Sequence, residues 1–398
     1  MSIRIESKCR LPAHAAIRLL IWTPMPNHHH ASFHRALRQA GVDLEVRYYQ
    51  GLTARRREMG WQNDREFEPW EKQVPPSLNA METVPDWKDR IHFIPGIGGG
   101  LFGDGFLKNL VRRLCQSGVA WVHWSESDYP GVSRLLRLPK RRWYARLVRR
   151  YALGAFGQGF LALRDFARWG IPQEKMALLC YATPSASQEV TLDEECADFR
   201  NGRHTFLCLG QLCRRKGTDL ILRAFAQVAT CNRDWGLLLV GKDQSGGQYH
   251  ALASKLGIDK QVFFRKPVPA TNISSVLNTA DVLLLPSRFD GWGLPLNEAA
   301  SAGLALIASD QVGSAYHLIH PGENGFIVRA GSVSSLANAM LAYVRNPSLC
   351  EIHGRHSLKV FPEYSPERSA ERVVNALTSW MSLDNRAFTP DATASWHR

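Results

Sequence analysis

Short apolar runs alternate with amphipathic stretches through the first half of the chain. Residues 17–23 (IRLLIWT) and 119–124 (VAWVHW) have the continuous apolar character of buried strands. Residues 30–41 (HASFHRALRQAG) and 106–118 (FLKNLVRRLCQSG) repeat apolar positions at helical spacing and end in glycine, a common helix stop. This half is therefore predicted to alternate strands with helices, around a polar insertion or long loop at residues 51–88.

The same alternation starts again after a polar, mixed segment at residues 183–203. Residues 204–210 (HTFLCLG), 235–241 (WGLLLVG) and 281–287 (DVLLLPS) are predicted strands, and 219–229 (DLILRAFAQVA) is a predicted helix. Such alternation is typical of parallel sheets with helices on both faces. The predicted fold class is therefore α/β, with two doubly wound domains. Folds of this kind bind ligands beyond the carboxyl ends of their strands, so the two domains should meet across a cleft.

The last amphipathic stretch, residues 366–383 (PERSAERVVNALTSWMSL), predicts a C-terminal helix. It follows Ser365, a favourable N-cap, and starts with proline. We expect this helix to pack back toward the N-terminal domain, and the polar residues 384–398 to form a disordered tail. The domains themselves are predicted at residues 1–195 and 203–365.

Positive charge is concentrated in the first half of the chain. The net charge is +13, and residues 1–190 contain 28 Lys and Arg against 17 Asp and Glu. This field favours anionic partners, such as phosphorylated substrates, an anionic membrane or nucleic acid. No apolar run approaches the ~20 residues of a membrane span, and the N-terminus lacks the apolar core of a signal peptide. A cytoplasmic location is the expectation.

A glycine turn joins a predicted strand to a predicted helix in ADVLLLPSRFDGWGLPLNEAASAG. Gly291 and Gly293 let a ligand approach the backbone closely, and the helix that starts near Pro295 offers unpaired N–H groups to an anion. Glu298, one turn into this helix, is placed to accept two hydroxyls of a ribose, and Asp290 precedes the turn. The alternative is structural: Asp290 caps a turn and Glu298 is a solvated helix residue.

A short basic loop follows the strand that ends at Gly210. It carries Arg214, Arg215 and Lys216, whose side chains suit a pyrophosphate at the carboxyl end of a strand. An isolated basic triplet is more often an exposed loop. Its position in the same half-chain as the glycine turn favours a shared anion site.

Four segments, in this order and spacing, resemble one family. They are GQLCRRKGTDLILRAF, LLLVGKD, ADVLLLPSRFDGWGLPLNEAASAGLALIAS and HPGENGFIV, and the resemblance covers roughly residues 203–345. They are similar to the C-terminal domain of retaining glycosyltransferases with the GT-B fold. The resemblance implies two Rossmann-like domains, of which the N-terminal one binds the acceptor and the C-terminal one binds a nucleotide-sugar donor. It also implies transfer with retention of anomeric configuration and no metal cofactor, the donor being UDP- or GDP-linked.

The resemblance also assigns roles in the donor site. The paired acids of the family, E-x7-E, correspond to Asp290 and Glu298, with Asp290 one methylene shorter than the usual glutamate. Glu298 would hold the ribose and Asp290 would face the donor sugar. At the diphosphate, Lys216 fits the family pattern, whereas Gln211 stands where an arginine is usual, and Arg215 can supply that charge. The backbone of Gly291, Trp292, Gly293 and Leu294 would contact the sugar and diphosphate.

Acceptor contacts are expected from the N-terminal half. His123 and Glu126 lie at the carboxyl end of the predicted strand VAWVHW. The family often has a histidine at a comparable place, near the donor sugar. His123 is therefore a candidate catalytic residue that orients or relays a proton, or else a histidine packed at a strand end. His28 and His29, in a triplet after the first strand, are assigned to an acceptor loop.

Residues 134–150 (RLLRLPKRRWYARLVRR) carry eight Lys and Arg among apolar residues, and are predicted to be mostly helical, at least after Pro139. Three interpretations stay open. The segment is a solvated basic helix, a surface for anionic lipid at the inner face of the plasma membrane, or a nucleic-acid contact. No recognisable nucleic-acid motif supports the third.

Together these features predict a retaining hexosyltransferase that moves a sugar from a nucleotide-diphosphate sugar to a polysaccharide, lipopolysaccharide or lipid-linked acceptor. Two alternatives remain. One is a GT-B epimerase-hydrolase of sugar nucleotides. The other is a non-catalytic protein that binds sugar nucleotides or an anionic membrane, which the departures at Asp290 and Gln211 would support.

Overall fold

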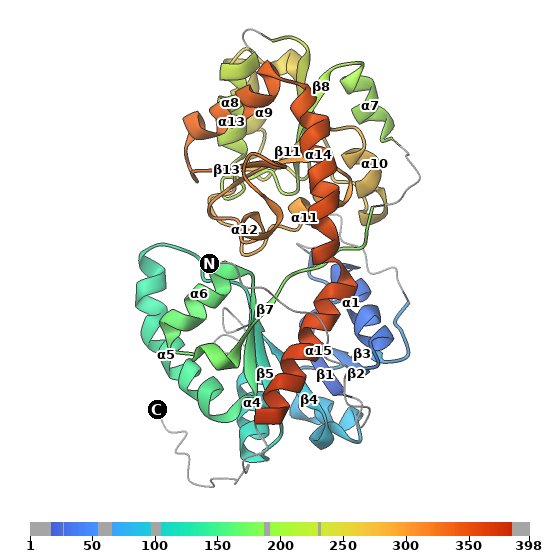
Figure 1. Cartoon of the computed structure of the whole chain (residues 1–398), viewed down its shortest axis with the longest axis vertical. Helices are drawn as coiled ribbons and strands as arrows, with labels where there is room; N and C mark the ends of the chain where they lie inside the picture. The colour runs from blue at the N-terminus through green and yellow to red at the C-terminus, as the bar shows by residue number, and fades with distance from the viewer. Residues whose placement is uncertain are drawn as a thin grey trace.

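The computed structural model shows two α/β domains that lie end to end along the long axis of the molecule (Figure 1). Each domain has one parallel sheet with helices on both faces, as the sequence predicts. The structure describes residues 17–26, 28–54, 66–96, 105–186, 192–229 and 232–383.

Seven strands form the N-terminal sheet, and every neighbouring pair is parallel. Two apolar clusters, one on each face, bury the sheet. In spatial order the strands are β3 (Glu71–Gln73), β2 (Asp43–Tyr48), β1 (Arg18–Thr23), β4 (Ile91–Pro95), β5 (Trp121–Ser125), β6 (Gly154–Gln158) and β7 (Met176–Leu179).

Six parallel strands form the C-terminal sheet, which is also covered by an apolar cluster on each face. In spatial order they are β10 (Val262–Arg265), β9 (Trp235–Val240), β8 (His204–Leu209), β11 (Val282–Leu285), β12 (Ala305–Ser309) and β13 (Gly325–Val328). The order reverses beside β8 and β11. In an open α/β sheet this is the point where ligands bind.

Helices connect the strands of both sheets. In the N-terminal domain they are α1 (His28–Gln39), α4 (Gly105–Gln116), α5 (Val132–Tyr151) and α6 (Phe160–Trp169). In the C-terminal domain they are α7 (Glu194–Arg200), α8 (Thr218–Ala229), α9 (Gln248–Lys255), α10 (Ile273–Leu277), α11 (Pro295–Ser301), α12 (Ala315–Leu318), α13 (Val333–Arg345) and α14 (Ser348–Val360). The last helix is α15 (Pro366–Leu383).

The helix α15 runs from the C-terminal domain back across the N-terminal one (Figure 1). Ser365 caps it, because its Oγ accepts the N–H of Arg368 at 3.3 Å. Its apolar face joins the core against β1, β2 and β6, and the indole Nε1 of Trp380 donates to the carbonyl of Glu174 at 2.9 Å. The helix therefore ties the end of the chain to the N-terminal domain. The predicted disordered tail, residues 384–398, lies outside the described residues.

One local prediction needs correction. The interpretation of residues 51–88 as an insertion or long loop missed β3, which extends the sheet beside β2, and two turns of 3-10 helix at Leu78–Thr83 and Trp87–Asp89. The basic segment is helical as predicted, and the helix spans Val132–Tyr151 with Pro139 inside it. Within the described residues, none of the helices combines the length and apolar composition needed to cross a bilayer.

Candidate active site

Loops at the carboxyl ends of β5, β8 and β11 meet between the two domains. Glu126 follows β5 in the N-terminal domain and lies directly against Gly291 of the C-terminal domain. A Cβ atom on Gly291 would lie 2.6 Å from Glu126 Cδ and 2.9 Å from Glu126 Cβ. Only glycine allows this approach at residue 291, so the turn and Glu126 are in direct contact where the two domains meet. We call this junction the interdomain cleft.

Backbone hydrogen bonds fix the glycine turn between β11 and α11. The N–H of Asp290 donates to the carbonyl of Gln311 at 2.9 Å, and the N–H of Gly313 donates to the carbonyl of Asp290 at 3.1 Å. Gly293 has φ +98°, a left-handed conformation that favours glycine. Within the described residues, no hydrogen bond engages the N–H groups of residues 291–294. Four amide donors are therefore available to a ligand at the start of a helix.

Lys216 crosses from the basic loop to the glycine turn. Its Nζ forms an ion pair with Asp290 Oδ2, and both side chains are largely buried. Arg215 lies beside it, and its Nη1 donates to the carbonyl of Phe289 at 3.1 Å. The two basic side chains predicted to hold a diphosphate therefore lie against the turn predicted to receive it. Gln211 lies half-buried two residues after the end of β8, on the same loop.

Two glutamates of the cleft have pKa values above the ordinary value of a glutamate. Burial within the cleft raises the pKa of Glu298 to about 7, and the charge of Lys216 only partly offsets this. Partial desolvation and the negative charge of Asp290 raise the pKa of Glu126 above its ordinary value. A carboxyl group with a pKa near neutrality can accept hydroxyl hydrogen bonds or take part in proton transfer.

The side chain of Trp292 has a role that the sequence did not indicate. It is 1% exposed and lies between the domains, with its ring stacked on His317 at 5.5 Å between centroids. Its Nε1 donates to Asn297 Oδ1 at 2.7 Å, and Asn297 Nδ2 donates to the carbonyl of Tyr181 at 3.0 Å. Because Tyr181 follows β7, this chain of contacts joins the glycine turn to the N-terminal domain.

His123 does not reach the cleft. It is fully buried, packed edge-on against Tyr144 of α5 and tilted against Phe166 of α6. Burial lowers the pKa of His123 to about 3, so the ring stays neutral, and its Nε2 lies 3.0 Å from Ser125 Oγ. The structure thus corrects the sequence-based placement of His123 beside the donor sugar: it supports β5 from below the sheet.

The histidine triplet forms the first turn of α1 rather than a loop. His28 and His29 belong to this turn, and their side chains lie outside what the structure describes. His30 stacks on Tyr181 at 5.6 Å between ring centroids, with the rings nearly parallel. The start of α1 therefore reaches the same junction between the domains as Trp292.

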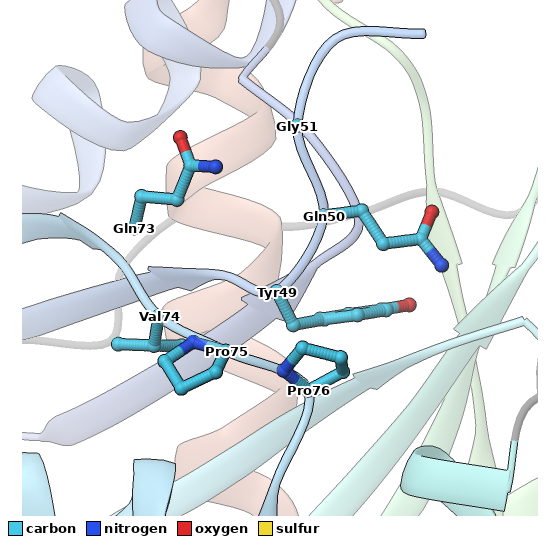
Figure 2. Close-up of a pocket in the computed structure, with 7 residues that line it drawn as sticks. All are labelled: Tyr49, Gln50, Gly51, Gln73, Val74, Pro75 and Pro76. Carbon is cyan, nitrogen blue, oxygen red and sulfur yellow. The ribbon is translucent and has the colours of Figure 1, made fainter.

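An uncharged hollow of about 510 Å³ opens at the carboxyl ends of β2 and β3, at the same edge of the sheet as Glu126 (Figure 2). Gln50 and Gln73 carry amide groups that can donate and accept hydrogen bonds, and both side chains are exposed. The full lining is Tyr49, Gln50, Gly51, Gln73, Val74, Pro75 and Pro76.

Comparison with known proteins agrees with this geometry. The sequence profile of the family described as Glycosyl transferases group 1 matches residues 193–359. This part of the C-terminal domain is therefore similar to a group 1 glycosyltransferase domain, over less than half of the chain. The domain contains Lys216, Asp290, Glu298 and the glycine turn, so the donor-site candidates all lie within it.

Two curated relatives each match less than half of this chain. A lipopolysaccharide core biosynthesis mannosyltransferase, LpcC of Rhizobium leguminosarum bv. viciae, is 30% identical over 194 residues, which are 47% of this chain and 53% of that protein. A GDP-mannose-dependent phosphatidylinositol monomannoside mannosyltransferase of Mycolicibacterium smegmatis is 30% identical over 168 residues, 39% of this chain and 43% of that protein. The chain therefore spans about half the length of the curated relatives it matches.

Solved structures extend the likeness to both domains and show that the fold is GT-B. HepE from Anabaena, in complex with UDP, has a TM-score of 0.71 at 15% identity, over 92% of this chain and 100% of that one. WaaG, a glycosyltransferase involved in lipopolysaccharide biosynthesis, has a TM-score of 0.58 at 16% identity, over 89% of this chain and 98% of that one. Within the described residues, no group of three or more His, Cys, Asp or Glu has the arrangement of a metal site.

Replacing Gly291 with alanine should push Glu126 of the N-terminal domain away from the glycine turn of the C-terminal domain. The new methyl group would overlap Glu126, including its Cβ, which moves only with the N-terminal backbone. We expect about a hundredfold loss of sugar transfer, since small displacements of reacting groups have effects of this size. Gly105→Ala is the matched control, because a Cβ there meets nothing within 4 Å. Full transfer activity in Gly291→Ala, measured as initial rate, would contradict the close approach of Glu126.

Proposed function

We propose that this chain is a retaining hexosyltransferase that uses a nucleotide-diphosphate sugar. The observation that carries the proposal is the meeting of Lys216, Asp290 and Glu298 at a glycine turn with four available amide donors, opposite Glu126. The relatives support the class of reaction, since those compared above are mannosyltransferases of lipopolysaccharide core and phosphatidylinositol mannosides. HepE, which shares the fold, was solved in complex with UDP, and this supports a nucleotide diphosphate as part of the donor.

The donor would lie along the C-terminal wall of the cleft. Glu298, in its charged form, would accept the two ribose hydroxyls, and such charge-assisted bonds are roughly twice as strong as neutral ones. Lys216 and Arg215 would face the diphosphate together with the amides of residues 291–294. Asp290 would then be released from Lys216 and would face the donor sugar.

The chemistry follows from where charge develops. When the bond between the anomeric carbon and phosphate oxygen breaks, negative charge grows on the leaving diphosphate. Lys216, Arg215 and the turn amides would face that position once the donor is bound. Because the two side chains are partly withdrawn from water, they would stabilise the transition state more than the ground state. This arrangement supplies the main catalytic effect from side chains and backbone of the C-terminal domain.

The acceptor would approach from the N-terminal wall. Glu126, whose pKa is raised above its ordinary value, would accept a hydrogen bond from the attacking hydroxyl. The hollow at Gln50 and Gln73 would bind a more distant part of the same acceptor, and its uncharged lining favours neutral sugar residues over phosphorylated ones. The acceptor is therefore proposed to be a glycan or a glycosylated lipid.

Thermal stabilisation by nucleotides is the first test. We expect one of UDP, GDP, ADP and CMP to raise the Tm of the purified chain, and Glu298→Ala to lose that rise because the ribose contact is gone. Release of the nucleotide from the matching sugar nucleotide, measured with and without a glycan acceptor, then separates the reactions. Acceptor-dependent release supports transfer. Release of free sugar without an acceptor would favour an epimerase-hydrolase, and no stabilisation by any nucleotide would contradict the donor site.

Donor affinity should fall as the pH falls through about 7. The pKa of Glu298 is raised to about 7, so its charged fraction drops from about nine tenths at pH 8 to about one tenth at pH 6. The Kd of the sugar nucleotide should therefore rise by up to about tenfold between these values. The stability of the ligand-free protein should change in the opposite direction, falling as the pH rises. Because the pKa of Glu298 in the folded state lies above the ordinary 4.5, this group contributes stability that is fully present below about pH 4.5 and is lost as the pH rises through about 7.

Glu298→Gln is the control for this titration, since the amide keeps the shape of the carboxyl group and does not ionise. The Kd measured with this variant should be higher than that of the wild type at pH 8 and nearly independent of pH. A wild-type Kd that is flat between pH 6 and pH 8 would exclude Glu298 as the ribose carboxylate.

A further inference from the structure

One face of α5 remains exposed although the rest of the helix is packed. Val132, Leu135 and Leu136 are 73%, 69% and 76% exposed, and Trp143 is 41% exposed. With Pro139 these residues recur at helical spacing, so they form one apolar stripe along the first half of the helix. A shallow hollow of about 430 Å³ continues the stripe beside Leu138 and Trp143.

Basic residues cover the second half of the same face. Lys140, Arg142 and Arg146 are exposed, and so are Arg149 and Arg150 at the end of the helix. The helix has no acidic residue between Val132 and Tyr151. The outward face therefore combines an apolar stripe with at least a fivefold positive charge, which we call the α5 face: residues 132, 135, 136, 139, 140, 142, 143, 146, 149 and 150.

The other basic residues of α5 have structural roles. Arg141 is buried and forms two bonds to the carboxylate of Asp128, at 2.5 and 2.9 Å, and Arg134 forms an ion pair with the buried Asp165. Arg137 donates to the carbonyl of Tyr129 at 3.2 Å. These inward contacts hold three of the eight basic residues against the body of the domain, whereas the side chains of the other five are exposed.

We propose that the α5 face docks on an anionic lipid surface. Exposed leucine, valine and tryptophan next to a row of lysine and arginine is the arrangement of a helix that lies in the membrane interface, with apolar side chains among the acyl chains and bases at the phosphates. Charge complementarity with anionic headgroups favours this occupant. A polyanion such as nucleic acid would pair with the bases and leave the apolar stripe in water.

Docking would also set the position of the cleft. The loop before α5 holds Glu126, and Arg141 and Arg137 fasten that loop to the helix through Asp128 and Tyr129. The ring of Tyr129 contacts Phe289 of the C-terminal domain at 4.9 Å between centroids, next to Asp290. The first turn of α5, where the apolar stripe begins, is therefore directly connected to the active-site cleft. A docked α5 would hold the cleft close to the lipid surface.

Cosedimentation of the full chain with vesicles tests the proposal without donor or acceptor, so it is independent of the proposed reaction. We expect binding to vesicles of phosphatidylcholine with about one third phosphatidylglycerol, little binding to phosphatidylcholine alone, and weaker binding as salt is raised. The double variant Leu136→Glu, Lys140→Glu should reduce binding by about tenfold or more.

The matched control makes the same two kinds of replacement on α14. Leu358 and Lys359 are both exposed there, and Leu358→Glu with Lys359→Glu changes the net charge by the same amount. This control should bind vesicles as the wild type does, and both variants should keep the wild-type Tm. Equal loss in both variants, or equal binding to both kinds of vesicle, would overturn the proposal. So would a wild-type dimer by light scattering that only the α5 variant breaks, since a second copy would then cover the face.

Discussion

Replacing Lys216 with alanine should lower kcat for sugar transfer by about 10²–10³, equivalent to about 3–4 kcal/mol of transition-state stabilisation. Lys216 is largely buried at the glycine turn, and its Nζ pairs with Asp290 in the free protein. The positive charge lowers the pKa values of both Glu126 and Glu298 against the effect of burial, so it acts on every acid of the cleft. Steady-state rates with saturating donor and acceptor measure the effect.

Arg214→Ala is the control for Lys216→Ala. Arg214 belongs to the same basic loop, but its side chain is exposed, so its loss should change kcat by less than about twofold. Lys216→Arg should recover only part of the rate, because a planar guanidinium does not replace a compact ammonium at a confined position. If Lys216→Ala keeps more than about a tenth of the wild-type kcat, the diphosphate does not lie at this position.

The proximity of Lys216 and Asp290 could be predicted because both residues occupy positions that the fold fixes. Lys216 and Asp290 are 74 residues apart, yet each follows a strand of the same parallel sheet, β8 and β11, which are neighbours. Carboxyl ends of adjacent parallel strands always lie at one edge of the sheet. Once both strands are recognised from their apolar runs, the two side chains must be near each other.

The acceptor half could not be predicted in the same way. The strand β5 is buried on both faces, so the alternation of polar and apolar residues that would reveal which way His123 points is absent. His123 faces Tyr144 and Phe166, and Glu126, three residues later, reaches the cleft instead. The strand β3 was missed for a related reason: its sequence, EKQ, is short and polar because it lies at the edge of the sheet.

Contacts between the domains were also beyond the sequence pattern. In DGWGLP the two glycines indicate a turn near a ligand. For the tryptophan between them, the sequence indicates only that its backbone N–H could contact that ligand. Its side chain instead connects parts of the chain that are far apart in sequence, Tyr181 and His317. Such a role depends on how two folded domains meet, and the local pattern of polar and apolar residues does not predict how they meet.

Trp292→Ala should therefore destabilise the protein and weaken donor binding together. Deleting a fully buried tryptophan costs about 3–5 kcal/mol, which corresponds to a fall in Tm of roughly 5–10 °C. It would leave Asn297 without its hydrogen bond at 2.7 Å, and Asn297 is the residue that binds the carbonyl of Tyr181 across the junction. Trp292→Phe should have an intermediate effect, because it keeps the ring contact with His317 but loses the indole donor. Calorimetry and nucleotide titration measure the two effects.

Trp235→Ala separates the junction from general loss of stability. Trp235 is 2% exposed and stacks on Phe206 in the core of the C-terminal domain, away from the glycine turn. Its replacement should lower the Tm by a similar amount, while leaving the donor Kd close to the wild-type value at a temperature where the variant is folded. A donor Kd that is unchanged in Trp292→Ala would mean that the turn keeps its shape without the tryptophan. The indole would then serve only the contact between domains. The backbone hydrogen bonds of residues 290 and 292 with residues 311, 313 and 314 would be sufficient to hold the donor site.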